Sequence, residues 1–299
     1  MTSTGLLTVR AQLQGAHLAA IDVELRRPAV TRLFIDQIPE AVVKTVPYLY
    51  TLCAHAQRAA AQAALAAAQG ESRRPVDDAE LWIEVLHENL WRLLLDWPLA
   101  LGLAPAKEAF VAWRAGRQGS ECISTTRHLL DTALLDVSEK CLEKLVDRDA
   151  PADCSSPLLN AEDWLAFWQG NAASPPAVHR PATVVAAYRA RLAEVERAGQ
   201  ALAAGAPFPI AAAAQAAWGV GQTLTARGVL THAVHLVDGR VLNYRVDAPT
   251  DALFADAGAL TALLAGRTFA HAAEARLALD QAILALDPCV PYSVELNHA

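Results

Sequence analysis

Alternating apolar and polar residues mark the start of the chain. Residues 6–13 and 18–25 each alternate well enough to predict a strand, with a turn at Gln14-Gly15 between them. From Pro39 onward the apolar residues recur at helical spacing instead, and the Ala-rich run at 54–69 predicts a central helix packed closely on all sides. The chain is therefore expected to begin with a hairpin and to continue into helices.

Helices dominate the prediction for the rest of the chain. An amphipathic run at 77–97 predicts a helix that ends at Pro98, because proline cannot continue the helical hydrogen bonds. The charge-free stretch at 199–226 is interpreted as buried helix and loop. One β element follows, because Asp238-Gly239 between alternating runs predicts a hairpin. The other predicted helices cover 105–115, 124–146, 160–169, 182–204, 255–265 and 271–285, and the two hairpin strands cover 223–237 and 240–246.

These elements predict one domain over residues 1–299, mainly α with a small β part. Its expected architecture is a central helical bundle with N-terminal strands and a mid-chain β-hairpin. No internal repeat divides the chain, and the Pro-containing stretches at 149–157 and 171–181 are interpreted as loops rather than domain linkers.

Composition and charge exclude several classes of protein. The chain has 25 Lys and Arg against 32 Asp and Glu, a net charge of −7, which argues against a nucleic-acid partner. No secretory signal precedes the strands, and the charge-free stretch is too rich in alanine to predict a membrane span. Five cysteines, an odd number at irregular spacing, are typical of a reducing cytoplasm rather than of a disulfide framework.

Three features are candidates for chemistry. Cys53, two residues before His55, lies at the predicted start of the central helix, where a thiol is either a buried structural residue or one whose pKa the helix dipole lowers. Cys289 lies between two prolines in a stiff segment, or is an incidental cysteine of a docked tail. Arg227 is the only charged residue at 199–237, so it either reaches solvent or meets an anion.

Together these features resemble the motifs of nickel–iron hydrogenase large subunits. Residues 50–57 (YTLCAHAQ) are similar to a degraded C-G-x-C-x-x-x-H motif, and residues 287–295 (DPCVPYSVE) resemble the closing D-P-C-x-x-C-x-x-H motif. Between them, residues 226–250 are similar to the A-P-R-G-x-L-x-H, D-G-K-I-x-N-Y and V-P-T segments, in the same order and with matching spacing. Residues 77–223 match only as generic helices. The resemblance implies a reduced form of the large-subunit fold.

The departures from these motifs concern the metal. Large subunits hold nickel with four thiolates, two of which bridge to an iron that carries two cyanides and one carbon monoxide. Here Tyr50 and Tyr292 replace one cysteine of each pair, which leaves Cys53 and Cys289 as the implied metal ligands. Two thiolates are too few for that nickel site. Glu295 replaces the last histidine of the closing motif, so no C-terminal cleavage is expected.

The residues around the diatomic ligands are retained. The resemblance places Arg227 beside the cyanides, Thr250 as a hydroxyl donor to a cyanide, and Leu230 and Pro249 as an apolar wall. A guanidinium and a hydroxyl both suit an anionic acceptor. Further ligands are left open, and the candidates are His55, Cys122, Cys141 and Cys154.

This pattern resembles the HupK/HoxV-type hydrogenase maturation proteins. It implies a non-catalytic scaffold that transiently holds an Fe(CN)2(CO) fragment, without nickel, before the fragment passes to the hydrogenase large-subunit precursor. The implied partners are that precursor and the maturation proteins that build the iron–cyanide–carbonyl unit. Two alternatives are a cofactor-free large-subunit mimic that docks maturation proteins, and a thiol enzyme built on Cys53 and His55.

Overall fold

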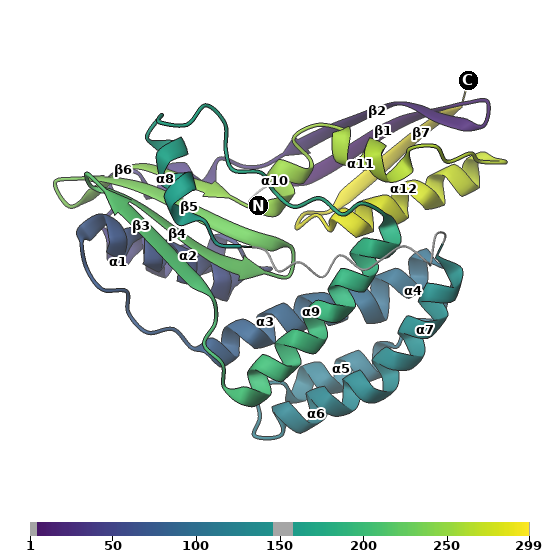
Figure 1. The fold of residues 1–299 in the computed structure, drawn as a ribbon, viewed down its shortest axis with the longest axis horizontal. Helices are drawn as coiled ribbons and strands as arrows, with labels where there is room; N and C mark the ends of the chain where they lie inside the picture. Colours follow the sequence, from purple (N-terminus) through teal and green to yellow (C-terminus); the bar gives the residue numbers. More distant parts are fainter. Residues whose placement is uncertain (1–4, 146–157, 299) are drawn as a thin grey trace.

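Two small sheets and a set of helices make up the computed structural model, which describes residues 5–145 and 158–298 (Figure 1). The mainly α prediction with a small β part is therefore confirmed. The strands are β1 (Leu6–Gln14), β2 (His17–Arg26), β3 (Ile210–Gln215), β4 (Trp218–Thr225), β5 (Gly228–Val237), β6 (Arg240–Asp247) and β7 (Tyr292–His298). The helices are α1 (Pro39–Leu49), α2 (Ala54–Gln69), α3 (Asp78–Trp91), α4 (Trp97–Ala100), α5 (Lys107–Gly116), α6 (Cys122–Leu129), α7 (Leu135–Lys144), α8 (Ala161–Trp168), α9 (Val184–Ala204), α10 (Pro249–Leu253), α11 (Gly258–Leu264) and α12 (Ala272–Leu286).

The first sheet joins the two ends of the described chain. Its strand order is β2-β1-β7, with β1 antiparallel to β2 and parallel to β7. The predicted N-terminal hairpin is confirmed, with its turn one residue later, at Gly15-Ala16. Strand β7 was not predicted. Its pairing, which begins where the Leu7 N–H donates to the Pro291 carbonyl at 3.0 Å, brings the segment around Cys289 to the N-terminal hairpin.

The second sheet has the order β3-β4-β5-β6, and all of its strands are antiparallel. The hairpin predicted at Asp238-Gly239 is confirmed as β5 and β6. The prediction of one strand over 223–237 is wrong, because a turn at Ala226-Arg227 divides it into β4 and β5. The interpretation of 199–226 as helix and loop holds as far as Pro209 and is wrong from Ile210 onward, because β3 and β4 lie there.

Close packing between α2 and β4 explains this error. A Cβ atom added to Gly219 would lie 2.1 Å from the Ala64 carbonyl oxygen, and one added to Gly221 would lie 2.2 Å from that of Ala60. The backbone of β4 therefore touches the backbone of α2, which only glycine in the strand and alanine in the helix allow. Glycine and alanine have low β propensity, so the sequence pattern does not predict this strand.

Gly221→Ala is expected to destabilise the protein by about 3 kcal/mol, because the added methyl group must push helix and strand apart. Gly116→Ala is the matched control, since a Cβ there meets no atom within 4 Å. Urea unfolding of both variants checks the prediction, and equal stability of Gly221→Ala and the unchanged protein would contradict this packing.

The helix predicted to end at Pro98 continues to Ala100. A π-helical segment at Arg92–Asp96 connects α3 to α4. Pro98 cannot donate a hydrogen bond to the Leu94 carbonyl, and the Ala106 N–H donates to that carbonyl instead, at 2.9 Å. A second π-helical segment, Leu130–Leu134, joins α6 to α7 within the predicted helix at 124–146. The remaining predicted helices differ from α5, α8, α9, α11 and α12 by a few residues at their ends.

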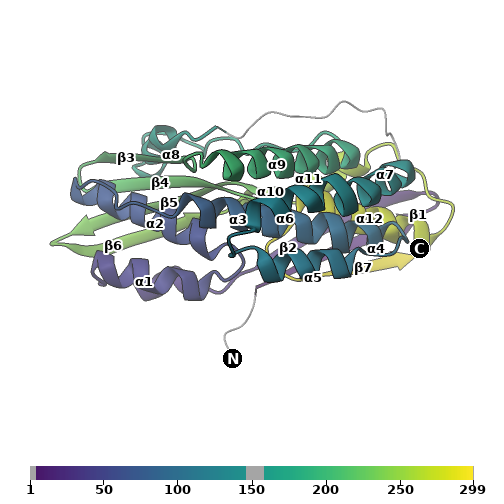
Figure 2. The same ribbon diagram turned by 90° about the horizontal axis from the view of Figure 1, so that it is seen from below.

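The helices lie around the two sheets in three groups (Figure 1). Helices α1 and α2 lie on one face of the four-stranded sheet and α8 on the other, while α11 and α12 pack on the N-terminal sheet. Helices α3 to α7 and α9 form a layer of their own, and Figure 2 shows the elongated outline that results. None of the helices in 5–145 and 158–298 combines the length and apolarity that a membrane crossing requires.

Candidate functional site

The Cys289 thiol lies in the loop between α12 and β7, where side chains from two other segments bind it. The Thr250 hydroxyl donates to Sγ at 3.2 Å and accepts from the Cys289 backbone N–H at 3.1 Å. Arg27 Nη2 donates to the same sulfur at 3.0 Å. The loop is therefore held to Thr250, the second residue of α10, and the Cys289 sulfur accepts two hydrogen bonds.

Cys53 lies immediately before α2 and is partly buried. The N-terminal donors of this helix are used elsewhere, because the Glu84 carboxylate accepts from the His55 and Ala56 N–H groups at 2.8 and 2.9 Å. Burial, together with the charge of Glu84, raises the pKa of Cys53 to about 12. The prediction that the helix dipole lowers the pKa of Cys53 is therefore wrong, and Cys53 is a neutral thiol.

The two thiols lie within electrostatic reach of each other although they are far apart in the sequence. The charge of Cys289 contributes to the raised pKa of Cys53, and both thiols contribute to the raised pKa of Arg227. Tyr50 belongs to the same group, because burial, Asp251 and both thiols raise its pKa to about 12. The phenol is therefore neutral and lies within electrostatic reach of both sulfurs.

Tyr292 has different surroundings. Its pKa is also raised to about 12, but by burial and then by the charge of Asp280, with smaller effects from Arg276, Arg92 and Asp96. Of the two tyrosines that stand at motif cysteine positions, Tyr50 is thus the one with both thiols in its electrostatic environment.

Arg227 belongs to a buried ion-pair network and lies within electrostatic reach of both thiols. Its guanidinium donates to Glu88 Oε2 at 3.0 Å and to the Asp287 carbonyl at 3.1 Å, and its side chain is 4% exposed. Of the two alternatives drawn from the sequence, solvent or an anion, the structure shows anions. One nitrogen, Nη1, is buried and has no hydrogen-bond partner among the residues that the structure describes. A buried donor of this kind is costly unless something accepts from it.

Asp287 is the centre of this network. Its carboxylate lies 2.6 Å from Arg92, 3.0 Å from Arg191 and 3.3 Å from Arg227. Burial alone would raise the pKa of Asp287, but these three guanidiniums outweigh it and lower the pKa to about 2. The π-helical segment of Arg92 and the left-handed backbone of Asp287 (φ 47°) aim the two side chains at each other. The network thereby fixes the residue pair that precedes Cys289.

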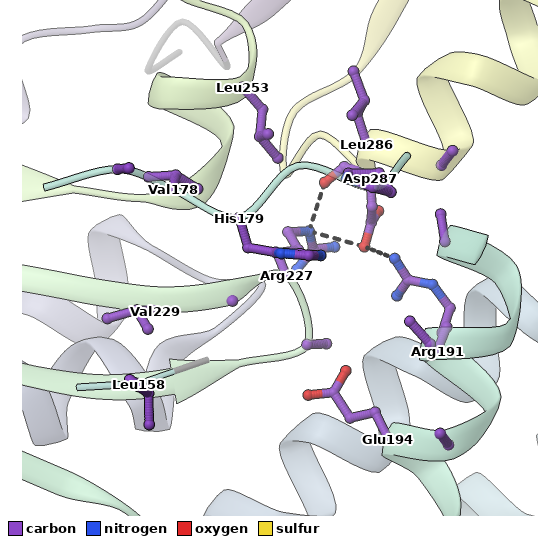
Figure 3. A pocket seen from close by; sticks show the side chains of 18 of the residues that line it. Leu158, Val178, His179, Arg191, Glu194, Arg227, Val229, Leu253, Leu286 and Asp287 are labelled. Atoms are coloured by element: carbon purple, nitrogen blue, oxygen red, sulfur yellow. Dashed lines mark hydrogen bonds and ion pairs between the residues drawn. The ribbon is translucent and has the colours of Figure 1, made fainter. Parts of the chain in front are cut away.

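A cavity of about 460 Å³ borders this network (Figure 3). Figure 3 shows Arg191 and Arg227 pointing at Asp287 from different elements, with Glu194 nearby on α9. Burial raises the pKa of Glu194 to about 7. Neither Cys53 nor Cys289 lines the cavity, so it is distinct from the thiol pair.

The other predicted site residues take different places. Leu230 is fully buried on β5, and Pro249, which begins α10, is buried with its ring 3.4 Å from a Cβ position on Gly228. Both are core residues next to the turn that carries Arg227, and no polar contact ties either to a thiol. His55 pairs with Glu80 at 3.1 Å.

The remaining cysteines are not part of the pair. Cys122 and Cys141 are buried on α6 and α7, where they contact Thr126 and Tyr188. Cys154 lies outside the described residues. Within 5–145 and 158–298, no group of three or more His, Cys, Asp and Glu side chains is arranged to hold a metal ion. The metal donors that the described site offers are thus two thiols.

Sequence reasoning missed three residues of the site: Arg27, Glu84 and Asp251. Arg27 binds Cys289, Glu84 caps the helix that follows Cys53, and Asp251 pairs with Arg27 at 2.7 Å. Of these three residues, only Asp251 could have been suspected from the sequence, because it directly follows the motif residue Thr250. The other two come from segments without any motif and reach the site only through the fold.

Solved hydrogenases share this fold. The Ni-Fe-Se hydrogenase from D. vulgaris Hildenborough superposes with a TM-score of 0.61 at 12% identity, over 93% of this chain and 94% of that one. An NAD+-reducing [NiFe]-hydrogenase superposes with a TM-score of 0.55 at 15% identity, over 91% and 92% of the two chains. The chain therefore has the nickel–iron hydrogenase large-subunit fold that the motifs implied.

No family model matches the chain. Curated relatives, in contrast, match it over nearly its whole length. The hydrogenase expression/formation protein HupV of Azotobacter chroococcum mcd 1 is 31% identical, and HupK of Azotobacter vinelandii is 32% identical, each over 99% of both chains. HoxV of Cupriavidus necator is 27% identical over 99% of this chain and 97% of its own. The chain belongs to the HupV/HupK/HoxV family of hydrogenase expression/formation proteins.

Proposed function

We propose that the protein is a non-catalytic scaffold of hydrogenase maturation that transiently holds an Fe(CN)2(CO) fragment through the thiolates of Cys53 and Cys289. The fragment is the cargo of the scaffold and passes on to the large-subunit precursor of a nickel–iron hydrogenase. The maturation proteins that build the iron–cyanide–carbonyl unit supply it, in the reducing cytoplasm that the cysteine pattern predicts.

The observation that carries this proposal is that both thiols lie within electrostatic reach of Arg227, and that one of them also contacts Thr250. Cys53 and Cys289 both contribute to the raised pKa of Arg227, and the Thr250 hydroxyl lies 3.2 Å from the Cys289 sulfur. Two thiolates are soft donors that suit iron, while a hydroxyl and a guanidinium are donors that suit a cyanide nitrogen. The buried Nη1 of Arg227, which lacks a partner among the described residues, supports the same assignment.

The donor set also supports a site without nickel. Tyr50 takes the place of a thiolate, and its raised pKa keeps it a neutral phenol rather than an anionic ligand. Both thiols are partly buried rather than sealed in the core. A fragment held by two sulfurs at a partly open site can be given up, which is what a scaffold requires and a resident active site avoids.

Metal analysis of the protein purified from hydrogenase-producing cells tests the proposal. We expect bound iron and no stoichiometric nickel. Full-length, folded protein that never carries iron, even when the transfer step is blocked by deleting the large-subunit precursor, would reject the scaffold role.

A second candidate function is a cofactor-free mimic that docks maturation proteins. The large-subunit fold favours it, as do exposed apolar side chains on and beside α1, where Leu33, Ile38 and Tyr48 are 60%, 46% and 83% exposed. Pull-downs from such cells separate the two. Under the mimic, a Cys53→Ala, Cys289→Ala double variant captures the same partners from iron-free protein.

The geometry gives no support to a thiol enzyme. The raised pKa of Cys53 disfavours a nucleophilic thiolate, and the His55 ring pairs with Glu80.

A further inference from the structure

Arg27 is a second arginine at the thiol pair, and it comes from a part of the chain without any motif. It follows β2 directly, and its side chain, 26% exposed, reaches inward from the N-terminal hairpin. There it makes two contacts, to Cys289 Sγ at 3.0 Å and to Asp251 Oδ1 at 2.7 Å. The parallel pairing of β1 with β7 brings the hairpin to this loop.

The two arginines of the site differ in how their charges are balanced. Arg227 is held by Glu88 and Asp287, both almost fully buried, so its charge is already met inside the protein. Among the carboxylates of the described residues, Arg27 pairs with Asp251 alone, and that carboxylate is 33% exposed with a pKa raised by burial. The ion pair of Arg27 is therefore the weaker one, and its guanidinium is the cation that an incoming anion can recruit.

The charge of the cargo calls for such a cation. Ferrous iron with two cyanides and one carbon monoxide is neutral, and two thiolates bring the bound complex to a charge of −2. The exposed nitrogen end of each cyanide carries much of that charge and accepts hydrogen bonds. A guanidinium beside the sulfur is the group best suited to it, because it offers several donors in a plane.

We propose that Arg27 is an anion-binding residue of this site, which binds a cyanide nitrogen of the held fragment, and that Asp251 competes for Arg27 in the unloaded protein. The inference rests on the proposed scaffold function for the identity of the anion. The anion site itself rests on the contacts of Arg27 and is testable without any metal.

The test compares two alkylating reagents at Cys289 in the metal-free, full-length protein. Iodoacetate is an anion and iodoacetamide is neutral, and both react with the thiolate. Their rate ratio at one pH therefore cancels the thiolate fraction and reports how well the site recruits an anion. Peptide mass spectrometry follows Cys289 separately from the other cysteines.

Arg27→Gln is expected to lower this ratio about fourfold, the effect of a unit charge about 5 Å away in a water-like dielectric. Arg27→Lys is expected to keep most of the ratio. Asp251→Asn is expected to raise it, because it removes the competing carboxylate. Arg26→Gln is the matched control, since that neighbouring guanidinium pairs with Glu24 on the surface, and it should leave the ratio unchanged.

Equal ratios in Arg27→Gln and Arg26→Gln would overturn the inference. Should Arg27→Gln fail to fold, Asp251→Asn decides, and an unchanged ratio in that variant overturns the inference as well. The two proposals fail separately. Iron on the purified protein with an unchanged ratio rejects only Arg27, whereas a lowered ratio in a protein that never carries iron rejects the scaffold and keeps the anion site.

Discussion

Cys53→Ala and Cys289→Ala are each expected to reduce bound iron to background while leaving the fold intact. A single thiolate cannot hold an iron fragment against the thiols of the cell, because the chelate formed by two sulfurs is lost. The fold should survive, because both thiols are only partly buried, and free cysteines at such positions contribute about 1 kcal/mol or less to stability.

The measurement is iron per chain after purification from hydrogenase-producing cells, together with the thermal midpoint of each variant. Cys122→Ser is the matched control, because it removes a thiol that lies on α6 and contacts Thr126 instead of the thiol pair. It should retain iron. A Cys53→Ala or Cys289→Ala protein with the iron content of the unchanged protein would show that this thiol is not a ligand.

Asp287→Asn is expected to cost about 3–5 kcal/mol of unfolding free energy, the largest effect on stability predicted for any single side chain here. The amide leaves Arg92, Arg191 and Arg227 buried around a group that no longer carries charge. Asparagine is the appropriate replacement, because it tolerates the left-handed backbone of this position (φ 47°) and so isolates the loss of charge. Since the network precedes Cys289, the variant should also lose iron.

The same carboxylate predicts how stability depends on pH. Its pKa is lowered to about 2 in the folded protein, from an ordinary value of 3.8. A lowered pKa means that the folded state favours the ionised form, so the stabilisation is complete above pH 3.8 and is lost as the pH falls towards 2. The unchanged protein should therefore lose about 2 kcal/mol more stability over this range than Asp287→Asn does.

Urea unfolding at neutral and acid pH measures both effects. Asp131→Asn is the control, because Asp131 makes a half-exposed pair with Arg127 on one helix face and its loss should cost about 0.5 kcal/mol or less. Equal stability of Asp287→Asn and Asp131→Asn would contradict the central place given to Asp287 in the network.

Much of the fold follows from patterns within single segments. The N-terminal hairpin, the alanine-rich α2 and the Asp-Gly hairpin were predicted because each carries its own periodicity or turn residues. The first five residues of strand β4, 218–222, were not predicted, because the glycines there fit the contact with α2 and have low strand propensity. Strand β7 was missed because its pairing partner, β1, lies at the other end of the chain.

The site, too, has residues that the sequence predicts and residues that only the fold reveals. Motif spacing pointed to Cys53, Cys289, Arg227 and Thr250. The structure places Thr250 in contact with Cys289, and both thiols within electrostatic reach of Arg227. The neighbours that decide their chemistry could not be predicted. Burial and the charge of Glu84 raise the pKa of Cys53 instead of lowering it, and Glu84 also accepts the His55 and Ala56 N–H groups at the start of the helix. Such neighbours belong to other segments, and one sequence alone does not reveal them.

The central claim is that one iron carrying cyanide and carbon monoxide is shared by the two thiols. Infrared spectroscopy of protein isolated anaerobically from hydrogenase-producing cells measures this directly, because cyanide and carbon monoxide bound to iron absorb where the protein does not. The account predicts cyanide and carbon monoxide bands in the unchanged protein and none in Cys53→Ala or Cys289→Ala. Iron-loaded protein without these bands, or bands that persist in both variants, would contradict it.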